Sequence, residues 1–121
     1  MAITLNHTIV PARDKEAAAR FFAELFGLRP GPSDYFVPVR VNETLTLLFD
    51  QDDSFESHHY AFHVGDAEFD TIFDRVKQAG LVYGSAPWSL EDRKLNDWNG
   101  VRGVYFKSSD GHLLELMTMP Q

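Results

Sequence analysis

The sequence predicts an α+β fold made of two tandem copies of one unit. Each copy has a histidine at a short apolar run, His7 or His59, and seven residues later an aspartate, Asp14 or Asp66, that opens a helical pattern. Apolar side chains then recur at helical spacing until a Gly-Leu pair ends the pattern. These positions are Ala18, Phe21, Phe22, Leu25 and Phe26 before Gly27, and Phe69, Ile72, Phe73 and Val76 before Gly80.

The first unit begins with a strand over residues 2–10, in which apolar and polar positions alternate. Asp14 is suited to cap the helix, and Gly27 to end it in a left-handed conformation. After a Pro-Gly-rich loop, residues 35–41 and 45–49 form a hairpin, and Pro38 places its first strand at a sheet edge. The strand face that we expect to point toward the core carries Ile3, Leu5, His7 and Ile9.

The second unit repeats this order and adds a long loop. We expect a strand over 58–64, a helix over 66–79, a short strand near 81–83, and two further strands at 103–107 and 113–117. The 121 residues suit one domain. We assign the whole chain, 1–121, to it, with module 1 at about 1–50, a linker at about 51–57 and module 2 at about 58–121.

The loop from Ser85 to Gly100 has no counterpart in the first unit. Long loops on small domains often serve as lids or binding loops, although a surface excursion held by aromatic anchors fits the sequence as well. If the loop is a lid, it and the strand after it supply the substrate contacts. The candidates are Trp88, Arg93, Asn96, Trp98, Asn99, Arg102 and Tyr105.

A carboxylate in the final apolar run points to a metal. Glu115 stands within LLELM, where an unpaired charge would cost several kcal/mol, about 2–5 after relaxation. The 52-residue offset matches His59 to His7 and leaves His58 on the opposite strand face, and superposing the two hairpin turns places Glu115 over Leu47. Two histidines and one acid at matching positions predict a metal site.

The composition of the chain limits the classes of partner that it can bind. The net charge is −7, with 18 acidic and 11 basic residues, so nucleic acid and anionic membranes are unsuitable partners. No apolar stretch is long enough to cross a bilayer, and the N-terminus lacks signal-peptide features, so we expect a soluble cytoplasmic protein. Without cysteine, any metal must use imidazole, carboxylate and water.

Three motifs make the chain resemble the vicinal oxygen chelate superfamily: LNHTIV, HHYAFHV and GVYFKSSDGHLLELM. That superfamily includes glyoxalases, bleomycin-resistance proteins, fosfomycin-resistance transferases and extradiol dioxygenases. The resemblance implies two βαβββ modules that curve into a half-barrel around a metal held by His7, His59 and Glu115. Glyoxalase I enzymes carry a fourth ligand at the position we align with Leu47, and here the chain differs from them.

The resemblance also implies a small metalloenzyme that binds a small-molecule substrate through two vicinal oxygens. Two imidazoles and one carboxylate suit Fe(II) and also accept Mn, Ni, Co or Zn. The reaction is then that of a lyase or isomerase, a thiol transferase or a ring-cleaving dioxygenase, with a non-catalytic drug-sequestering protein as the alternative. Superfamily members often pair modules from two chains, so we expect a homodimer with shared sites.

Overall fold

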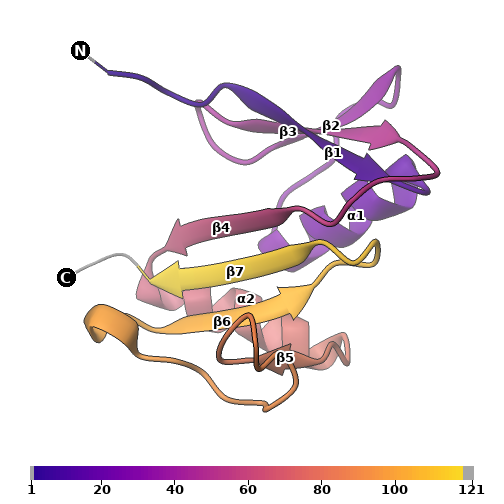
Figure 1. The fold of residues 1–121 in the computed structure, drawn as a ribbon. Helices are drawn as coiled ribbons and strands as arrows, with labels where there is room; N and C mark the ends of the chain where they lie inside the picture. The colour runs from indigo at the N-terminus through magenta and orange to yellow at the C-terminus, as the bar shows by residue number, and fades with distance from the viewer. Residues whose placement is uncertain (1, 119–121) are drawn as a thin grey trace. The chain divides into compact units, whose positions relative to one another are not determined.

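Each half of the chain forms a β-sheet with a helix packed on it, as the computed structural model of the protein shows for residues 2–118 (Figure 1). The chain divides into two compact units, residues 1–56 and 57–121. The α+β fold of two tandem modules is therefore confirmed. The first unit contains β1 (His7–Ala12), α1 (Lys15–Phe26), β2 (Phe36–Arg40) and β3 (Thr46–Gln51). The second contains β4 (His59–Val64), α2 (Asp66–Gln78), β5 (Tyr83–Gly84), the 3-10 turn η1 (Trp98–Gly100), β6 (Gly103–Lys107) and β7 (Leu113–Thr118).

In the first unit, the sheet has the strand order β1-β3-β2, with β1 parallel and β2 antiparallel to β3. The Asp14 carboxylate accepts a hydrogen bond from the Ala17 N–H at 3.1 Å and so caps α1. Gly27 ends the helix at a φ of 72°, a left-handed conformation that glycine adopts without strain. Both helix boundaries agree with the sequence-based prediction.

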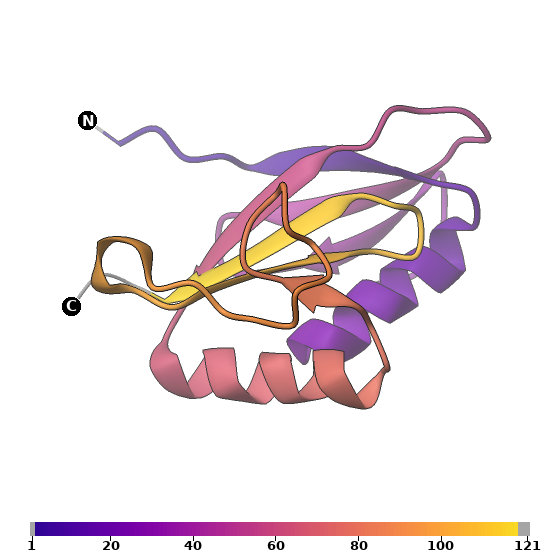
Figure 2. The same ribbon diagram turned by 60° about the horizontal axis from the view of Figure 1, so that its bottom comes forward.

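In the second unit, the strand order is β4-β7-β6-β5, with β4 parallel to β7 and the other pairs antiparallel. Helix α2 lies along one face of this sheet (Figure 2). Its apolar side packs Phe69, Ile72 and Val76 into the core. The same face of the sheet buries Val104, Phe106, Leu114 and Leu116. The opposite face is therefore free to carry polar side chains.

The two units differ at one strand. The second unit has the complete βαβββ order, whereas the first replaces the strand equivalent to β5 with an isolated bridge between Pro30 and Val39. Pro30, which forms the bridge, and nearby Pro32 carry no backbone N–H, so neither can donate the hydrogen bonds that would extend a ladder. The proline-rich loop thus explains the shorter first sheet.

The strand register corrects the alignment of Glu115 with Leu47. His7 pairs with Thr46, and His59 pairs with Leu113, so the residue equivalent to Glu115 is Leu48. The prediction was wrong by one residue because it superposed Asp110 on Asn42, whereas the strand pairing places Asp110 over Glu43, and a slip of one residue reverses the face of every side chain. Leu47 is buried at 2% exposure, whereas Leu48 and Glu115 are both partly exposed.

The expected core face of β1 is also corrected. Its buried residues are Val10, Pro11 and Ala12, while His7 is exposed and Ile9 is 37% exposed. Ile3 and Leu5 precede the strand and are exposed. His7 therefore lies exposed at the start of the strand instead of in the core. Within residues 2–118, no helix is long and apolar enough to cross a membrane.

Candidate metal centre

His59 and Glu115 meet on the open face of the second sheet. Glu115 pairs in register with Ala61, and His59 lies two residues earlier on the same face of β4. The His59 Nε2 atom lies 3.0 Å from Glu115 Oε1. The histidine side chain is 46% exposed and the glutamate 14%, so solvent reaches the imidazole while the carboxylate lies deeper. Parallel pairing of β4 with β7 thus joins two residues 56 positions apart.

The spacing of these two atoms suits a pair of neighbouring metal ligands. Metal–nitrogen and metal–oxygen bonds of about 2.0–2.2 Å at a right angle would separate the two ligand atoms by about 3 Å. Because the carboxylate accepts, Nε2–H of His59 donates in this contact, and a metal would take the place of that proton. One imidazole and one carboxylate form a donor set for a divalent transition metal. The pair fits the metal that the sequence predicts.

The predicted third ligand, His7, belongs to the first unit. Its Nδ1 atom lies 2.8 Å from the side-chain oxygen of Asn6, which can only accept, so the ring proton is on Nδ1. Nε2 then carries a free lone pair, the arrangement typical of a metal-binding histidine oriented by a neighbour. Among residues 2–118, no three ligating side chains form one group. The structure supplies the His59–Glu115 pair, and His7 stays a prediction.

Tyr105 supports the carboxylate from the adjacent strand. It pairs with Glu115 across β6 and β7, and its ring centroid lies 6.0 Å from that of His59. Burial, together with the hydrogen bond to Glu115, raises the pKa of Tyr105 to about 12. The phenol therefore stays neutral at physiological pH and donates to Glu115. Sequence reasoning proposed Tyr105 as a substrate contact and missed its hydrogen bond to Glu115. The signal was the hairpin at Asp110-Gly111, because pairing its two strands places Tyr105 opposite Glu115.

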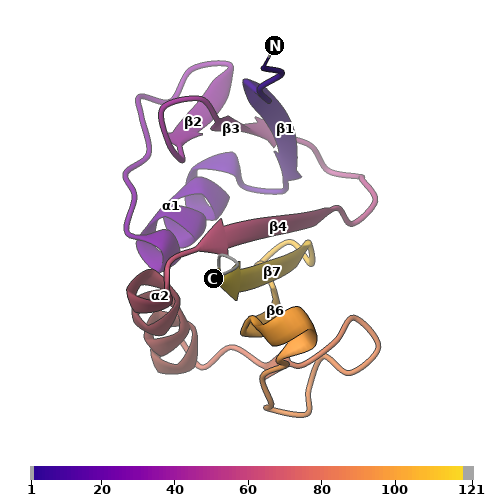
Figure 3. The ribbon, with the colours of Figure 1, turned by 90° about the vertical axis from the view of Figure 1, so that its left-hand side faces the viewer.

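The loop between β5 and β6 packs against its own sheet beside β6 (Figure 3). The Asn96 side-chain amide donates to the Ser85 carbonyl at 2.8 Å, and its backbone pairs with Gly103. The Asp92 carboxylate accepts hydrogen bonds from the Ser85 hydroxyl and, at 3.0 Å, from the Ser85 N–H, and these bonds lower the pKa of its carboxyl group. These bonds close the loop into a defined shape. Asn96 is thus an anchor of the loop.

Two aromatic rings of the loop, those of Trp98 and Trp88, continue a row of neighbouring rings that starts at Tyr105. The Trp98 and Tyr105 centroids are 6.2 Å apart, and the Trp88 and Trp98 rings stack at 5.9 Å with an interplanar angle of 25°. Three predicted contact residues therefore form a continuous aromatic group that begins at the His59–Glu115 pair. Trp88, at its outer end, is 80% exposed.

The other predicted contacts lie elsewhere. The Arg102 guanidinium donates to Asp70 at 2.7 Å and to Asp66 at 3.0 Å, and it covers the Phe69 ring at 4.5 Å. The guanidinium is therefore tied to α2, and its contact with a substrate stays a prediction. Asn99 adopts a left-handed φ of 57° within η1 and shapes that turn.

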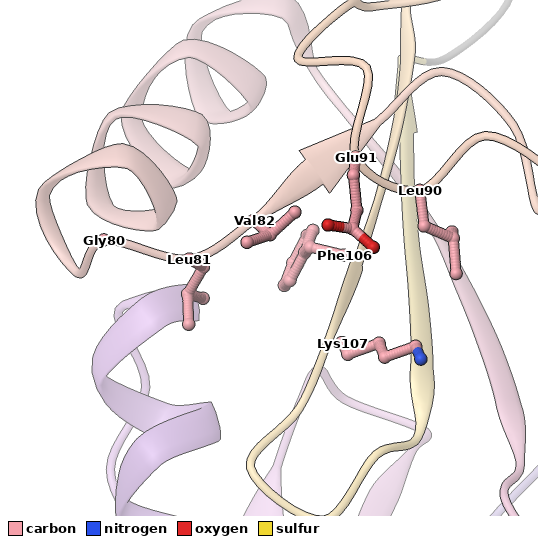
Figure 4. Close-up of a pocket in the computed structure, with 7 residues that line it drawn as sticks. All are labelled: Gly80, Leu81, Val82, Leu90, Glu91, Phe106 and Lys107. Atoms are coloured by element: carbon pink, nitrogen blue, oxygen red, sulfur yellow. The ribbon is translucent and has the colours of Figure 1, made fainter.

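A hollow of about 440 Å³ lies where the end of α2, the loop and β6 meet (Figure 4). It is lined by Gly80, Leu81, Val82, Leu90, Glu91, Phe106 and Lys107. Arg93 lines a smaller neighbouring hollow that also includes Lys77. Neither His59 nor Glu115 belongs to either lining. These hollows are thus separate from the metal-binding pair.

Solved structures and curated proteins similar to this chain include two oxidases and a glutathione transferase. The oxidase ChaP-H2 shares 42% identity over 99% of this chain and 96% of its own, with a TM-score of 0.92. The oxidase ChaP-H1 shares 43% identity over 98% of both chains, also with a TM-score of 0.92. The glutathione transferase FosA of Serratia marcescens is 29% identical over 96% of this chain and 81% of its own length. No protein-family model matches the chain.

Proposed function

The chain belongs to the vicinal oxygen chelate superfamily, and from this premise we propose that it is a divalent-metal-dependent oxidase of small molecules that carry two neighbouring oxygen atoms. The observation that carries the proposal is the 3.0 Å contact between His59 and Glu115. The two oxidases at 42–43% identity favour oxidation over the thiol transfer suggested by the 29% identical transferase.

The proposed ligands are His59, Glu115 and His7, and Fe(II) is the metal that best suits two imidazoles and one carboxylate. Fe(II) held by three protein ligands supplies open positions for vicinal oxygens and for dioxygen, together with Lewis acidity and one-electron chemistry. Glu115 contributes negative charge, and Tyr105 fixes its orientation. Trp98 lies beside Tyr105, with the two ring centroids 6.2 Å apart.

We further propose that the active form is a homodimer with shared sites. The second unit holds two of the three ligands, so the third comes from the first unit of the same chain or of a second copy. In members of the superfamily, modules from two chains often pair, so that the remaining ligand comes from the second copy. The absence of cysteine is compatible with the cytoplasmic location that we also propose, since no disulfide is at risk there.

Metal content tests the ligand assignment. The wild-type protein should bind about one Fe(II) per chain after anaerobic reconstitution. His59→Ala and Glu115→Ala should each lose most of it, because one ligand cannot replace the pair. His58→Ala is the matched control, since His58 is the exposed neighbour whose ring hydrogen-bonds to Tyr60 and not to Glu115. Full metal content in Glu115→Ala would reject the centre.

Nitrocatechol serves as a vicinal-oxygen probe for the reaction class. Binding through both oxygens should shift its visible absorption in the iron-loaded protein and not in the metal-free protein. Dioxygen uptake with a panel of catechols and hydroxyketones supports the oxidase. Conjugation of a substrate to glutathione without dioxygen uptake would instead identify a transferase.

A further inference from the structure

Asn99 differs from the other asparagines of the chain in two ways. It is the only asparagine of the sequence that precedes a glycine, Gly100. Among residues 2–118, its side-chain amide also has no hydrogen-bond partner. The other three asparagines have side-chain hydrogen bonds, which join Asn6 to His7, Asn42 to Thr44 and Leu45, and Asn96 to Ser85. Asn99 is therefore the asparagine whose side chain is free to turn toward the main chain.

Asn99 lies in the exposed turn η1, which leads from the loop into β6 (Figure 3). Its φ of 57° and ψ of 27° are left-handed values, which asparagine tolerates better than most residues. The Gly100 N–H donates to the Asp97 carbonyl at 3.1 Å, and the Val101 N–H donates to the Trp98 carbonyl at 3.2 Å. No residue of the turn is buried. Opening of the turn therefore costs only a small part of the free energy of global unfolding.

We propose that Asn99 is a modification site, which converts spontaneously to aspartate and isoaspartate in the folded protein. We infer further that the isoaspartate product releases Trp98 from its place beside Tyr105. The reaction needs only water as a co-reactant. It depends neither on a bound metal nor on the proposed oxidase function.

The chemistry follows from the atoms that the opened turn brings together. Once its hydrogen bond to Asp97 is broken, the Gly100 nitrogen attacks the side-chain carbonyl carbon of Asn99. The new carbon–nitrogen bond forms as the N–H proton is lost, and the bond to the side-chain nitrogen breaks to release ammonia. Nothing obstructs the attack, because a Cβ added to Gly100 would meet no atom within 4 Å. Water then opens the resulting succinimide ring at either carbonyl, and no electron is gained or lost.

The isoaspartate product has a consequence for the row of aromatic rings. It places one additional methylene group in the main chain between Trp98 and Gly100, and it adds one negative charge. A three-residue turn with i→i+3 hydrogen bonds cannot take up the longer main chain. Trp98 then loses the geometry that places its ring 6.2 Å from Tyr105 and stacks it on Trp88 at 5.9 Å. Modification of Asn99 thus detaches the aromatic rings of the loop from β6.

Peptide mass spectrometry of the metal-free protein, incubated in mildly alkaline buffer, tests the site. Trypsin releases residues 95–102 as one peptide, and fragmentation of this peptide distinguishes Asn99 from Asn96. The acidic products should accumulate at Asn99 with time and become substrates of isoaspartate methyltransferase. Asn96 is the internal control and should stay intact. Asn99→Gly keeps the left-handed conformation without the side-chain amide, so it should give no product.

The rate of modification should depend on the opening of η1. Trp98→Ala removes the ring contacts that hold the turn, so it should raise the rate at Asn99 severalfold. Tyr35→Phe, a change at a 75% exposed tyrosine of the first unit, should leave the rate unchanged. Urea below the unfolding transition should have little effect, because opening of the turn exposes little surface. A rate at Asn99 no faster than at Asn96 would overturn the site, and a steep rise with urea would assign the reaction to the unfolded chain instead.

Tryptophan fluorescence tests the release of Trp98. The emission of the wild type should shift to longer wavelength as isoaspartate accumulates, because the ring becomes more exposed to water. Incubated Asn99→Gly should show no such change. Freshly purified Asn99→Asp carries the additional charge without the additional methylene group, so it should keep the emission of the unmodified protein. An unchanged emission after full conversion to isoaspartate would contradict the release.

Discussion

At the scale of single residues, the neutral phenol of Tyr105 is as important as the ligand it supports. Burial also raises the pKa of Tyr60 to about 12, and the Tyr60 hydroxyl lies 2.6 Å from His58 Nδ1. Groups that hydrogen-bond to a metal ligand commonly change metal affinity by about 10–100-fold when removed. If Glu115 binds a metal as we propose, removal of the Tyr105 hydroxyl should therefore weaken metal binding.

The raised pKa values of Tyr60 and Tyr105 predict a loss of stability in alkali. Both folded-state values are about 12, above the ordinary value of 10.0, so the unfolded chain releases these protons first as pH rises. The stabilisation is fully present below pH 10 and declines between pH 10 and 12. Urea denaturation across this range should show a shallower decline for Tyr105→Phe than for the wild type. If the free energy of unfolding declines equally with pH in both proteins, Tyr105 does not contribute to the loss of stability. Tyr35→Phe serves as the control.

At the scale of elements, the tight approach of the loop to β5 determines how the aromatic rings are presented. A Cβ added to Gly84 would lie 1.9 Å from the Ser89 carbonyl oxygen, a rigid backbone atom. Likewise, a Cβ on Gly103 would lie 2.6 Å from the Asn96 side chain. The two glycines thus let the loop lie directly on the strands.

Gly84→Ala should therefore displace the loop. We expect it to lower the free energy of unfolding by about 1–3 kcal/mol, the usual cost of overpacking, and to change the tryptophan emission. Gly65→Ala is the matched control, because the nearest atom to its Cβ is the flexible end of Glu68 at 3.3 Å. The control should stay within about 0.5 kcal/mol of the wild type. A similar emission spectrum and stability for both variants would mean that the loop is not held as described.

The helix boundaries, the order of helices and strands along the chain, and the shared strand face of His59 and Glu115 could all be predicted from the sequence. Helix caps such as Asp14 and Gly27 depend only on residues close to them in the sequence. The alternation of apolar and polar residues along a strand indicates which face is buried. The equivalence of Leu48 with Glu115 could not be predicted, because the strand register depends on turn geometry that residue types do not specify. The commitment of Arg102 to α2 was equally hidden, since any surface arginine can pair with several of the 18 acidic residues.

At the scale of the whole molecule, the proposed shared site makes a prediction about mixed dimers. His7→Ala and Glu115→Ala proteins, refolded together, should recover metal binding, because each mixed dimer has one site with both changes and one with neither. With random pairing, about half the dimers are mixed, so about a quarter of wild-type sites should return. Metal content of dimers isolated by differential tagging measures this. No recovery in verified mixed dimers would assign all three ligands to one chain.

The parallel pairing of β4 with β7 has a consequence for how the protein is made. Strand β4 ends at Val64 and β7 begins at Leu113. Helix α2, the loop and β6 therefore all lie between the two strands in the chain. Contacts between such distant segments form late in folding, because the entropy of closing the intervening chain must be overcome first. His59 and Glu115 are therefore apart in a nascent or partly folded chain, which cannot hold iron between them. A metal that needs both side chains as ligands would therefore bind only after β7 has paired with β4, so the topology would delay metal binding until the second sheet is complete.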